Sequence, residues 1–315
     1  IQKKEGENVM GGYVVRRIVS MVITLFFVIT LTFVMMHSIP GNPFTGEKNL
    51  PPAIEKALME KYNLDKPLSQ QYVDYVSGVA KGDFGPSMKY NGRTVNDLIG
   101  DGFPVSAELG GLAILLIVIL GIPLGVVAAL KQGTWVDRTM IFFAIVGVTI
   151  PSFVLATLLI YVFGTKLKWL PTSRWVSWKS RIMPTIALGV SSIAYVARLT
   201  RSSMLEVINQ DYIRTARAKG LSETVVVFKH ALKNALIPVV TYLGPLTAAI
   251  LTGSFIIEKI FAVPGMGRMF VESISNRDYT VIMGVTIFYS LILVLFIFIV
   301  DLIYGLIDPR IKINK

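Results

Sequence analysis

The sequence contains no cysteine and only two histidines, His37 and His230, in 315 residues. The lack of cysteine excludes disulfides, thiolate metal sites and cysteine nucleophiles, and two histidines argue against a histidine-built metal site or catalytic triad. Charged residues are also scarce, at 16%, against about 25% in soluble domains, whereas 53% of the residues are hydrophobic. One soluble core of this length could not cover so much apolar surface, so we expect lipid as the solvent.

Negative charge is the scarcer sign, with 20 acidic against 31 basic residues and a formal net charge of +11. Such a balance suggests nucleic acid, anionic lipid or an acidic partner. Because the composition indicates a membrane-embedded chain, we expect contact with membrane lipid and with partner proteins, and no nucleic acid.

Six continuous apolar runs meet or approach the roughly 20 residues that a helix needs to cross a bilayer. They do not alternate as the strands of an outer-membrane barrel do. We therefore predict an all-α integral membrane protein with six transmembrane helices, over residues 18–39, 105–130, 138–165, 182–200, 235–257 and 280–306. A cleaved signal peptide is an alternative for the first run, but the run is too long and lacks an A-x-A site, so an uncleaved anchor is favoured.

The distribution of lysine and arginine favours both termini inside the cell. This N-in/C-in topology places residues 1–17, 201–234 and 307–315 in the cytoplasm and residues 40–104 and 258–279 outside. The basic loop around Lys166 and Lys168 runs against the rule, but the first helix usually dominates. We expect a multi-pass protein of the plasma membrane.

The first outer segment, residues 40–104, is too long for a plain connector and is expected to fold. Pro52 and Pro67 each stand where a helix could start, because proline suits the first helical position. The segment is either a small cap packed on the helix ends or a docking surface for a soluble outside partner; we favour the cap.

The inner segment 201–234 predicts a short helix, a glycine turn and a second helix. Asp211 and Ser222 could cap the two helices, and Gly220 fits the left-handed position after the first. Small residues keep the first helix thin, so another protein could approach its backbone. Three interpretations compete: a DNA-binding helix–turn–helix, for which the flanking spans leave little room; a surface lying on anionic headgroups; and a dock for a cytoplasmic protein.

At these residues the chain resembles the permease subunits of ABC importers. Their cytoplasmic loop carries Glu-Ala-Ala, three residues, then Gly; here the stretch is Arg214-Thr215-Ala216, three residues, then Gly220. The missing Glu departs from the general motif but suits the peptide and nickel branch, where the form seen in Tyr212–Leu221 is usual.

Further matches to that branch follow in order along the chain: Ile39–Pro43, Gly82–Gly85, Ile150–Phe153, Arg198–Arg201, Asn234–Pro238, Phe261–Gly267, Arg277–Tyr279 and Asp308–Arg310. Within the branch the chain is most similar to oligopeptide permease B subunits of the Gram-positive type.

The resemblance implies an ABC transmembrane type-1 domain over residues 105–306 and a role as half of a peptide-conducting pore. The implied partners are a homologous C permease subunit, two cytoplasmic ATPase subunits that bind ATP and Mg, and an extracellular substrate-binding lipoprotein that delivers peptide. The ATPase-coupling contact would comprise Arg214, Thr215, Ala216, Arg217, Ala218, Lys219, Gly220 and Leu221. The chain has no G-x-x-x-x-G-K-[ST] motif, so ATP hydrolysis is expected on another polypeptide and this chain is expected to be neither an enzyme nor a cofactor-binding protein.

Candidates for the pore or its gate are Pro151, Ser191, Tyr195, Tyr242, Pro245 and Ser254. Glu108 and Asp301 lie near span ends, where they can reach the interface. Import of nickel or another small solute stays open, as does an ion-coupled secondary transporter. The latter predicts internal repeats and a mid-span acid, neither of which we find. An intramembrane enzyme is the most distant alternative.

Overall fold

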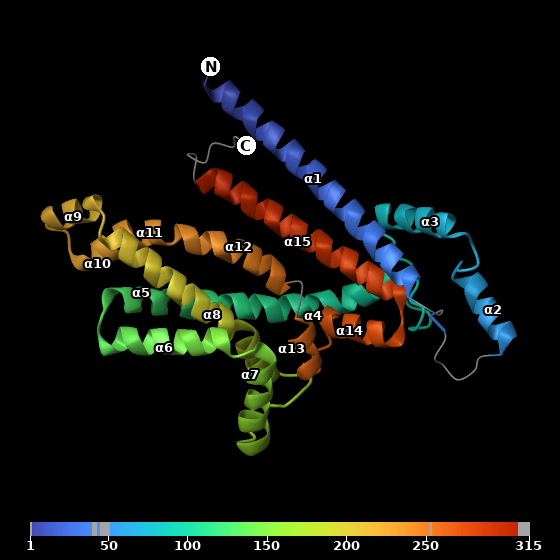
Figure 1. Cartoon of the computed structure of the whole chain (residues 1–315). Coiled ribbons are helices and arrows are strands. Elements are labelled where there is room, and N and C mark those ends of the chain that lie inside the picture. Colours follow the sequence, from blue (N-terminus) through green and yellow to red (C-terminus); the bar gives the residue numbers. More distant parts are fainter. Residues whose placement is uncertain (1, 40–42, 45–50, 252–253, 308–315) are drawn as a thin grey trace. The chain divides into compact units, whose positions relative to one another are not determined.

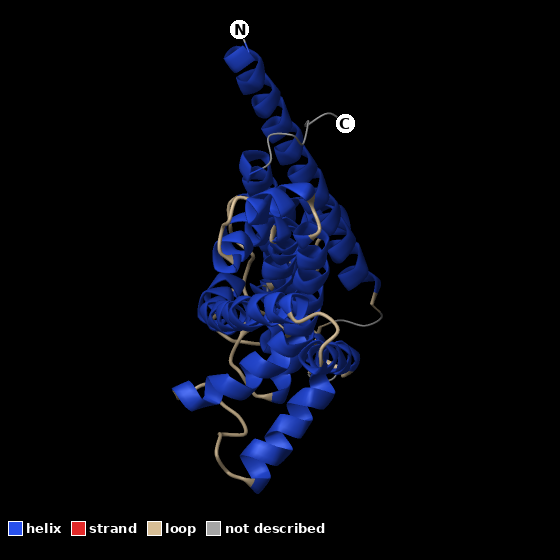
Figure 2. Cartoon of the chain, turned by 90° about the vertical axis from the view of Figure 1, so that its left-hand side faces the viewer, coloured by secondary structure: helices blue, strands red, loops and turns tan. Residues whose placement is uncertain are grey.

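The structure of the chain is a computed structural model that describes residues 2–39, 43–44, 51–251 and 254–307. These residues are helical apart from turns and loops, and their only extended pairing is an isolated bridge between Pro86 and Thr94 (Figure 2). The predicted all-α class is confirmed.

The helices follow one another as labelled in Figure 1. In chain order they are α1 (Gln2–Ser38), α2 (Pro52–Lys61), α3 (Leu68–Ala80), α4 (Val95–Leu116), α5 (Ile122–Leu130), α6 (Trp135–Thr149), α7 (Ser152–Leu159), α8 (Trp178–Ile208), α9 (Asp211–Ala218), α10 (Glu223–Val225), α11 (Leu232–Ala235), α12 (Ile237–Leu251), α13 (Phe255–Ile260), α14 (Met266–Asn276) and α15 (Tyr279–Ile307). Three π-helical segments accompany them: η1 (Ile117–Gly121) between α4 and α5, η2 (Ile160–Lys166) after α7, and η3 (Val226–Ala231) between α10 and α11.

Five segments of the described chain are long and apolar enough to cross a membrane: Val14–Ser38, Val95–Leu130, Trp178–Ile208, Ile237–Ile260 and Tyr279–Val300. The fourth runs across residues 252–253, which lie outside the described residues. A sixth span exists if α6 and the α7–η2 segment, which meet at 101°, form one broken crossing. A helical membrane protein is therefore confirmed, whereas the count of six stays a prediction that depends on this pair.

The break between α6 and α7 lies at Ile150 and Pro151. Both have extended backbone, with ψ of 120° and 139°. Proline has no N–H to continue the helix, and its ring pushes the preceding residue away from helical angles. The span predicted over residues 138–165 is therefore divided at the proline that interrupts its apolar run, and the chain turns there into two limbs.

Two helices extend well beyond the apolar runs that predicted them. α4 begins at Val95, ten residues before the predicted span, and α8 continues to Ile208. The start of α4 is fixed by a reciprocal cap: Thr94 N–H donates to Asp97 Oδ2 at 2.9 Å, and Asp97 N–H donates to Thr94 Oγ1 at 3.1 Å. The Thr-x-x-Asp pattern thus marks the start of α4, which a search for apolar runs alone does not locate.

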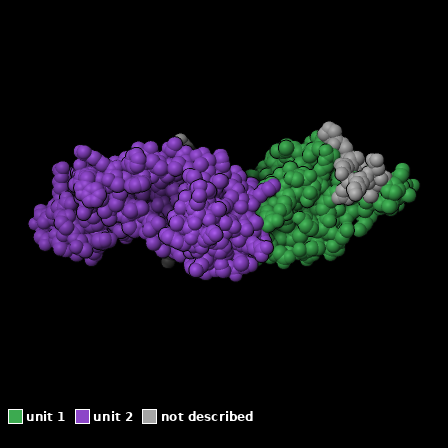
Figure 3. All heavy atoms as spheres, turned by 90° about the horizontal axis from the view of Figure 1, so that it is seen from below, with its two compact units in different colours: residues 1–104, 265–315 green, residues 105–264 purple. Residues whose placement is uncertain are grey.

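The chain divides into two units, residues 1–104 with 265–315, and residues 105–264 (Figure 3). In the second unit α5 and α8 cross closely at Gly125, where a Cβ atom would lie 2.4 Å from the carbonyl oxygen of Ala197. Small residues at such crossings let helix backbones approach when the surrounding lipid gives no hydrophobic drive.

In the first unit α1 packs along α15 (Figure 1). Helix α2 begins at Pro52 and α3 directly after Pro67, as predicted. Asp278 connects the loop after α3 to the start of α15: it accepts hydrogen bonds from the Ser87 hydroxyl at 2.5 Å and from the N–H groups of Met88 and Lys89, each at 3.2 Å. Its side chain is fully buried, so the first outer loop is fixed onto the last long helix.

Candidate functional site

Helix α9 has one buried and one exposed side. Ile213 and Ala216 are buried against a cluster that includes Val126, Met204 and Val226. The exposed side, which we call the α9 surface, consists of Arg214, Thr215, Arg217, Ala218, Lys219, Gly220 and Leu221. Seven of the eight residues predicted for this contact therefore share one accessible surface. Ala216 does not: it fixes the helix to the protein instead, because its position three residues after Ile213 turns it to the same inner side.

Gly220 ends α9 in the left-handed conformation, with φ +74°. Gly220 N–H donates to the Arg217 carbonyl at 2.9 Å and Leu221 N–H to the Ala216 carbonyl at 3.4 Å. This pair of bonds is the Schellman arrangement, which satisfies carbonyls at a helix end. The left-handed glycine turn predicted at Gly220 is confirmed.

The predicted capping residue of α9 is wrong by one position. The N-cap is Gln210, and Asp211 is the first helical residue. There the Asp211 carboxylate lies 3.6 Å from Arg214, and negative charge in the first turn is favourable beside the helix dipole. Ser222 takes the predicted cap position before α10, but within the described chain its side chain makes no capping hydrogen bond.

Two side-chain contacts hold the turn after α9. Arg217 donates to Glu223 through Nε at 2.7 Å and Nη2 at 3.2 Å, so the pair spans Gly220. These bonds hold the pKa of the Glu223 carboxyl below its usual range and raise the pKa of the Arg217 guanidinium. On the other side Asn234 donates to the Tyr212 hydroxyl at 2.7 Å. The exposed α9 surface is therefore held in place by side-chain hydrogen bonds on two sides.

A buried ion pair lies near the same end of the second unit. Arg201 on α8 donates to Asp137 on α6 through Nε at 2.6 Å and Nη2 at 2.8 Å, and Gly133 N–H donates to the same carboxylate at 2.9 Å. The Asp137 side chain is 4% exposed and that of Arg201 22%. The pair joins α8, which leads to α9, to the α5–α6 turn. Sequence reasoning missed it, because no local pattern relates positions 64 residues apart.

Four of the six pore or gate candidates occur on two neighbouring helices. The rings of Tyr195 on α8 and Tyr242 on α12 pack with centroids 4.3 Å apart, and Arg198 lies over the Tyr195 ring at 5.8 Å. Ser191 is one turn before Tyr195 and Pro245 about one turn after Tyr242, and both are exposed. We call this set the aromatic face.

The other two candidates have local backbone roles. Pro151 is the α6–α7 break, and the Ser254 hydroxyl caps α13 by accepting a hydrogen bond from Ile257 N–H at 3.3 Å.

Two acidic residues of the second unit make contacts that sequence reasoning did not predict. Glu258 on α13 is fully buried and accepts a hydrogen bond from the Ser106 hydroxyl at 2.9 Å. Glu108 on α4 accepts from Arg181 Nε at 2.5 Å and from Trp175 Nε1 at 2.9 Å. Both carboxylates thus connect segments far apart in the sequence. Among the residues described, His, Asp and Glu form no group of three or more that could hold a metal ion.

Comparison with known proteins gives a match along nearly the whole chain. Residues 121–313 match the family described as binding-protein-dependent transport system inner membrane component, and residues 10–110 match the N-terminal part of such membrane components. The dipeptide transport system permease protein DppB of Bacillus subtilis is 53% identical over 97% of this chain and 99% of its own length. The oligopeptide transport system permease protein OppB of Salmonella typhimurium is 49% identical over 96% of this chain and its own full length.

Solved structures support the same fold. An amino acid ABC transporter chain, 19% identical, aligns with a TM-score of 0.51 over 66% of this chain and 93% of its own. The MetNI methionine ABC transporter, 17% identical, gives 0.51 over 67% and 96%. The resemblance to ABC importer permeases that the motifs predicted is confirmed. The chain belongs to the family of binding-protein-dependent transport system inner membrane components.

Proposed function

We propose that the chain is the membrane permease subunit of an ATP-driven oligopeptide importer and that it forms half of the translocation pore. The observation that carries this function is the α9 surface, a braced and exposed projection in a chain whose relatives are named dipeptide and oligopeptide transport permeases. The chain lacks a nucleotide-binding P-loop, so energy enters through contact with other subunits.

The α9 surface is suited to transmit a displacement. Its inner side is fixed by Ile213 and Ala216, which belong to one apolar cluster with Val226 of η3 and Met204 of α8. Helix α9 packs on η3, so a push on α9 would reach η3 first and then α8 through this shared cluster. Two cytoplasmic ATPase subunits, holding ATP and Mg, would shift the chain between inward-open and outward-open states by binding one state better than the other.

A larger side chain at position 218 tests how closely the ATPase approaches α9. Ala218 is chosen because it is exposed, whereas the nearby Ala216 is buried. Ala218→Tyr should leave thermal stability unchanged but lower the recovery of ATPase subunits with the purified complex by about tenfold, the effect of some 1.4 kcal/mol of lost contact. Ser69→Tyr, on the exposed side of α3, is the control and should retain them. A complex that keeps its ATPases and full transport with Ala218→Tyr would contradict the proposed contact.

The aromatic face is proposed as this chain's contribution to the pore. A second, homologous permease would cover it and complete the channel. Aromatic rings and a hydroxyl offer contacts that suit peptide backbones without selecting a side chain. An extracellular binding lipoprotein would deliver the peptide to the outer side.

The proposed function is tested by uptake of a radiolabelled tripeptide into proteoliposomes that contain this chain, a second permease, the ATPases and a binding protein. Uptake should require ATP enclosed within the proteoliposomes. It should persist when a protonophore dissipates the proton gradient and be unaffected by excess nickel. Uptake that needs no ATP but stops with the proton gradient would indicate a secondary transporter. Nickel uptake in place of peptide uptake would assign the cargo differently.

A further inference from the structure

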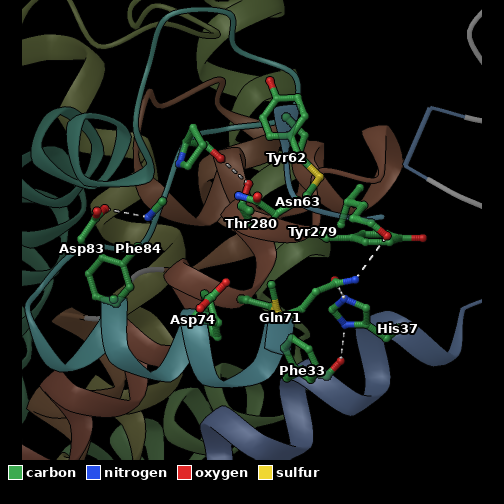
Figure 4. A pocket seen from close by; sticks show the side chains of 17 residues that line it. Phe33, His37, Tyr62, Asn63, Gln71, Asp74, Asp83, Phe84, Tyr279 and Thr280 are labelled. Atoms are coloured by element: carbon green, nitrogen blue, oxygen red, sulfur yellow. Dashed lines mark hydrogen bonds between the residues drawn. The ribbon is translucent and has the colours of Figure 1, made fainter. Parts of the chain in front are cut away.

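A cavity of about 320 Å³ lies in the first unit, outside both surfaces described above. Its walls come from the end of α1, one side of α3, the loop around residues 83–88 and the start of α15 (Figure 4). The volume is sufficient for one small organic group or one long side chain.

The lining combines aromatic rings with carboxylates. The rings belong to Phe33, Tyr62, Tyr75, Phe84 and Tyr279. Asp74 and Asp83 contribute the carboxylates, and none of the seventeen lining residues is a lysine or arginine. In a chain with a net charge of +11, the cavity lining itself thus carries acidic side chains and no lysine or arginine.

Several polar groups of the lining are already used within the chain. Each ring nitrogen of His37 lies within hydrogen-bond distance of an oxygen, Nδ1 at 2.9 Å from the Phe33 carbonyl and Nε2 at 3.1 Å from Gln71 Oε1, and a neutral ring can donate to one of the two. Gln71 is oriented by donating to the carbonyls of Leu64 at 3.2 Å and Lys66 at 2.8 Å. These bonds fix the walls, so the cavity is preformed.

Other polar groups of the lining stay unpaired. The hydroxyls of Tyr75 and Tyr279 are buried and have no hydrogen-bond partner among the described residues. Burial raises the pKa of the Tyr75 hydroxyl. A buried hydroxyl without a partner is unfavourable, but both oxygens are closed off from solvent, so contacts with a ligand in the cavity would come from its rings and carboxylates.

The Asp74 carboxylate already has an ammonium group of the chain as its neighbour. Lys66 Nζ lies 3.2 Å from Asp74 Oδ2. The two side chains are 34% and 53% exposed, and a pair so open to water contributes at most about 1 kcal/mol. An incoming ammonium group can therefore displace Lys66.

We propose that this cavity binds an alkylammonium group. A cation over aromatic faces, with a carboxylate beside it, is the arrangement that recognises ammonium ligands. The group is either the free N-terminus of a peptide or the side chain of a lysine on an outside partner protein. The assignment of the cavity holds for either source, and only the peptide alternative rests on the proposed function.

The charge preference can be measured because the chain has no cysteine of its own. Leu64→Cys places one thiol in the lining, and Ser69→Cys, on the exposed side of α3, serves as the reference. In the intact transporter, the rate of modification by the cationic aminoethyl methanethiosulfonate is divided by that of the anionic sulfonatoethyl reagent. This ratio should be about tenfold higher at residue 64, because Asp74 lines the same cavity and a carboxylate in a partly wet site favours a cationic reagent by about this factor.

Substitutions of charged residues test whether the preference for the cationic reagent arises in the cavity. Asp74→Asn should abolish most of the excess, and Lys66→Gln should increase it. Met88→Cys, at another residue of the lining, is the second reporter if Leu64→Cys lowers the yield of folded complex. Equal ratios at residues 64 and 69, or a ratio unaffected by Asp74→Asn, would overturn the proposal.

Protection of the residue 64 thiol from a neutral methanethiosulfonate tests the ligand and its source. Nα-acetyl-lysine amide should protect and the Nα,Nε-diacetyl compound should not; equal protection by both would overturn the proposal. Protection by trialanine but not N-acetyl-trialanine identifies a peptide N-terminus, and protection by the purified binding protein alone identifies a partner lysine. Tripeptide uptake, measured on the same proteoliposomes, reports separately on the proposed function.

Discussion

Replacing Gly220 with leucine should lower ATP-driven peptide uptake at least about tenfold while ATP hydrolysis by the complex continues. Gly220 has φ +74°, and holding an L-residue there is unfavourable by about 1–2 kcal/mol. A Cβ atom would meet no described atom within 4 Å, so the effect is backbone strain and not a clash. The chain would relieve the strain by opening the Schellman turn, which would move Leu221 and the end of α9 out of position.

Two variants isolate this cause. Gly220→Asn should retain most of the uptake, because asparagine tolerates the left-handed region better than other residues. Gly92→Leu introduces a similar strain, at φ +76°, in the loop before α4, and should leave coupling intact. The measurement is the ratio of peptide transported to ATP hydrolysed in proteoliposomes. A normal ratio with Gly220→Leu would mean that α9 does not couple the two.

Replacing Asp137 with alanine should destabilise the chain by about 3–5 kcal/mol, the effect of leaving one member of a buried ion pair without its partner. The substitution removes both Arg201 bonds and the bond from Gly133 N–H. Loss of this size should lower the apparent unfolding temperature by roughly 10 °C, as followed by circular dichroism in detergent. Arg201→Met, which leaves the carboxylate buried alone, should have a similar effect.

The double variant Asp137→Leu with Arg201→Met is the informative control. Apolar replacement of a whole buried pair is often neutral or stabilising, so the double variant should unfold at a higher temperature than either single variant. If its unfolding temperature instead fell by the sum of the two single effects, the residues would be acting independently. Transport by the double variant would show whether the pair also carries motion from α8 to α6.

Features that depend on local chemistry could be predicted from the sequence. The helical spans, the helix starts at Pro52 and Pro67, and the left-handed turn at Gly220 follow from apolar run length, proline and glycine. Proline at position 151 is visible in the sequence, but the 101° angle between α6 and the α7–η2 segment depends on how the two limbs pack.

Features that depend on partners distant in sequence could not be predicted. Ala216 is indistinguishable from Ala218 until α9 is seated on its neighbours, and only one of them is buried. Asp137 and Arg201 are ordinary charges at segment ends until the fold brings them to 2.6 Å. Glu258 becomes a candidate for a special role only when its complete burial is known.

The position of Asp278 has a consequence for biogenesis. The residues that it holds, Ser87 to Lys89, leave the ribosome 189 to 191 residues earlier. At about 5–20 residues per second, the nascent outer loop would wait roughly 10–40 s for the carboxylate that completes it. During this interval the Ser87 hydroxyl and the N–H groups of Met88 and Lys89 lack this acceptor, and a chain truncated before residue 278 would lack it permanently.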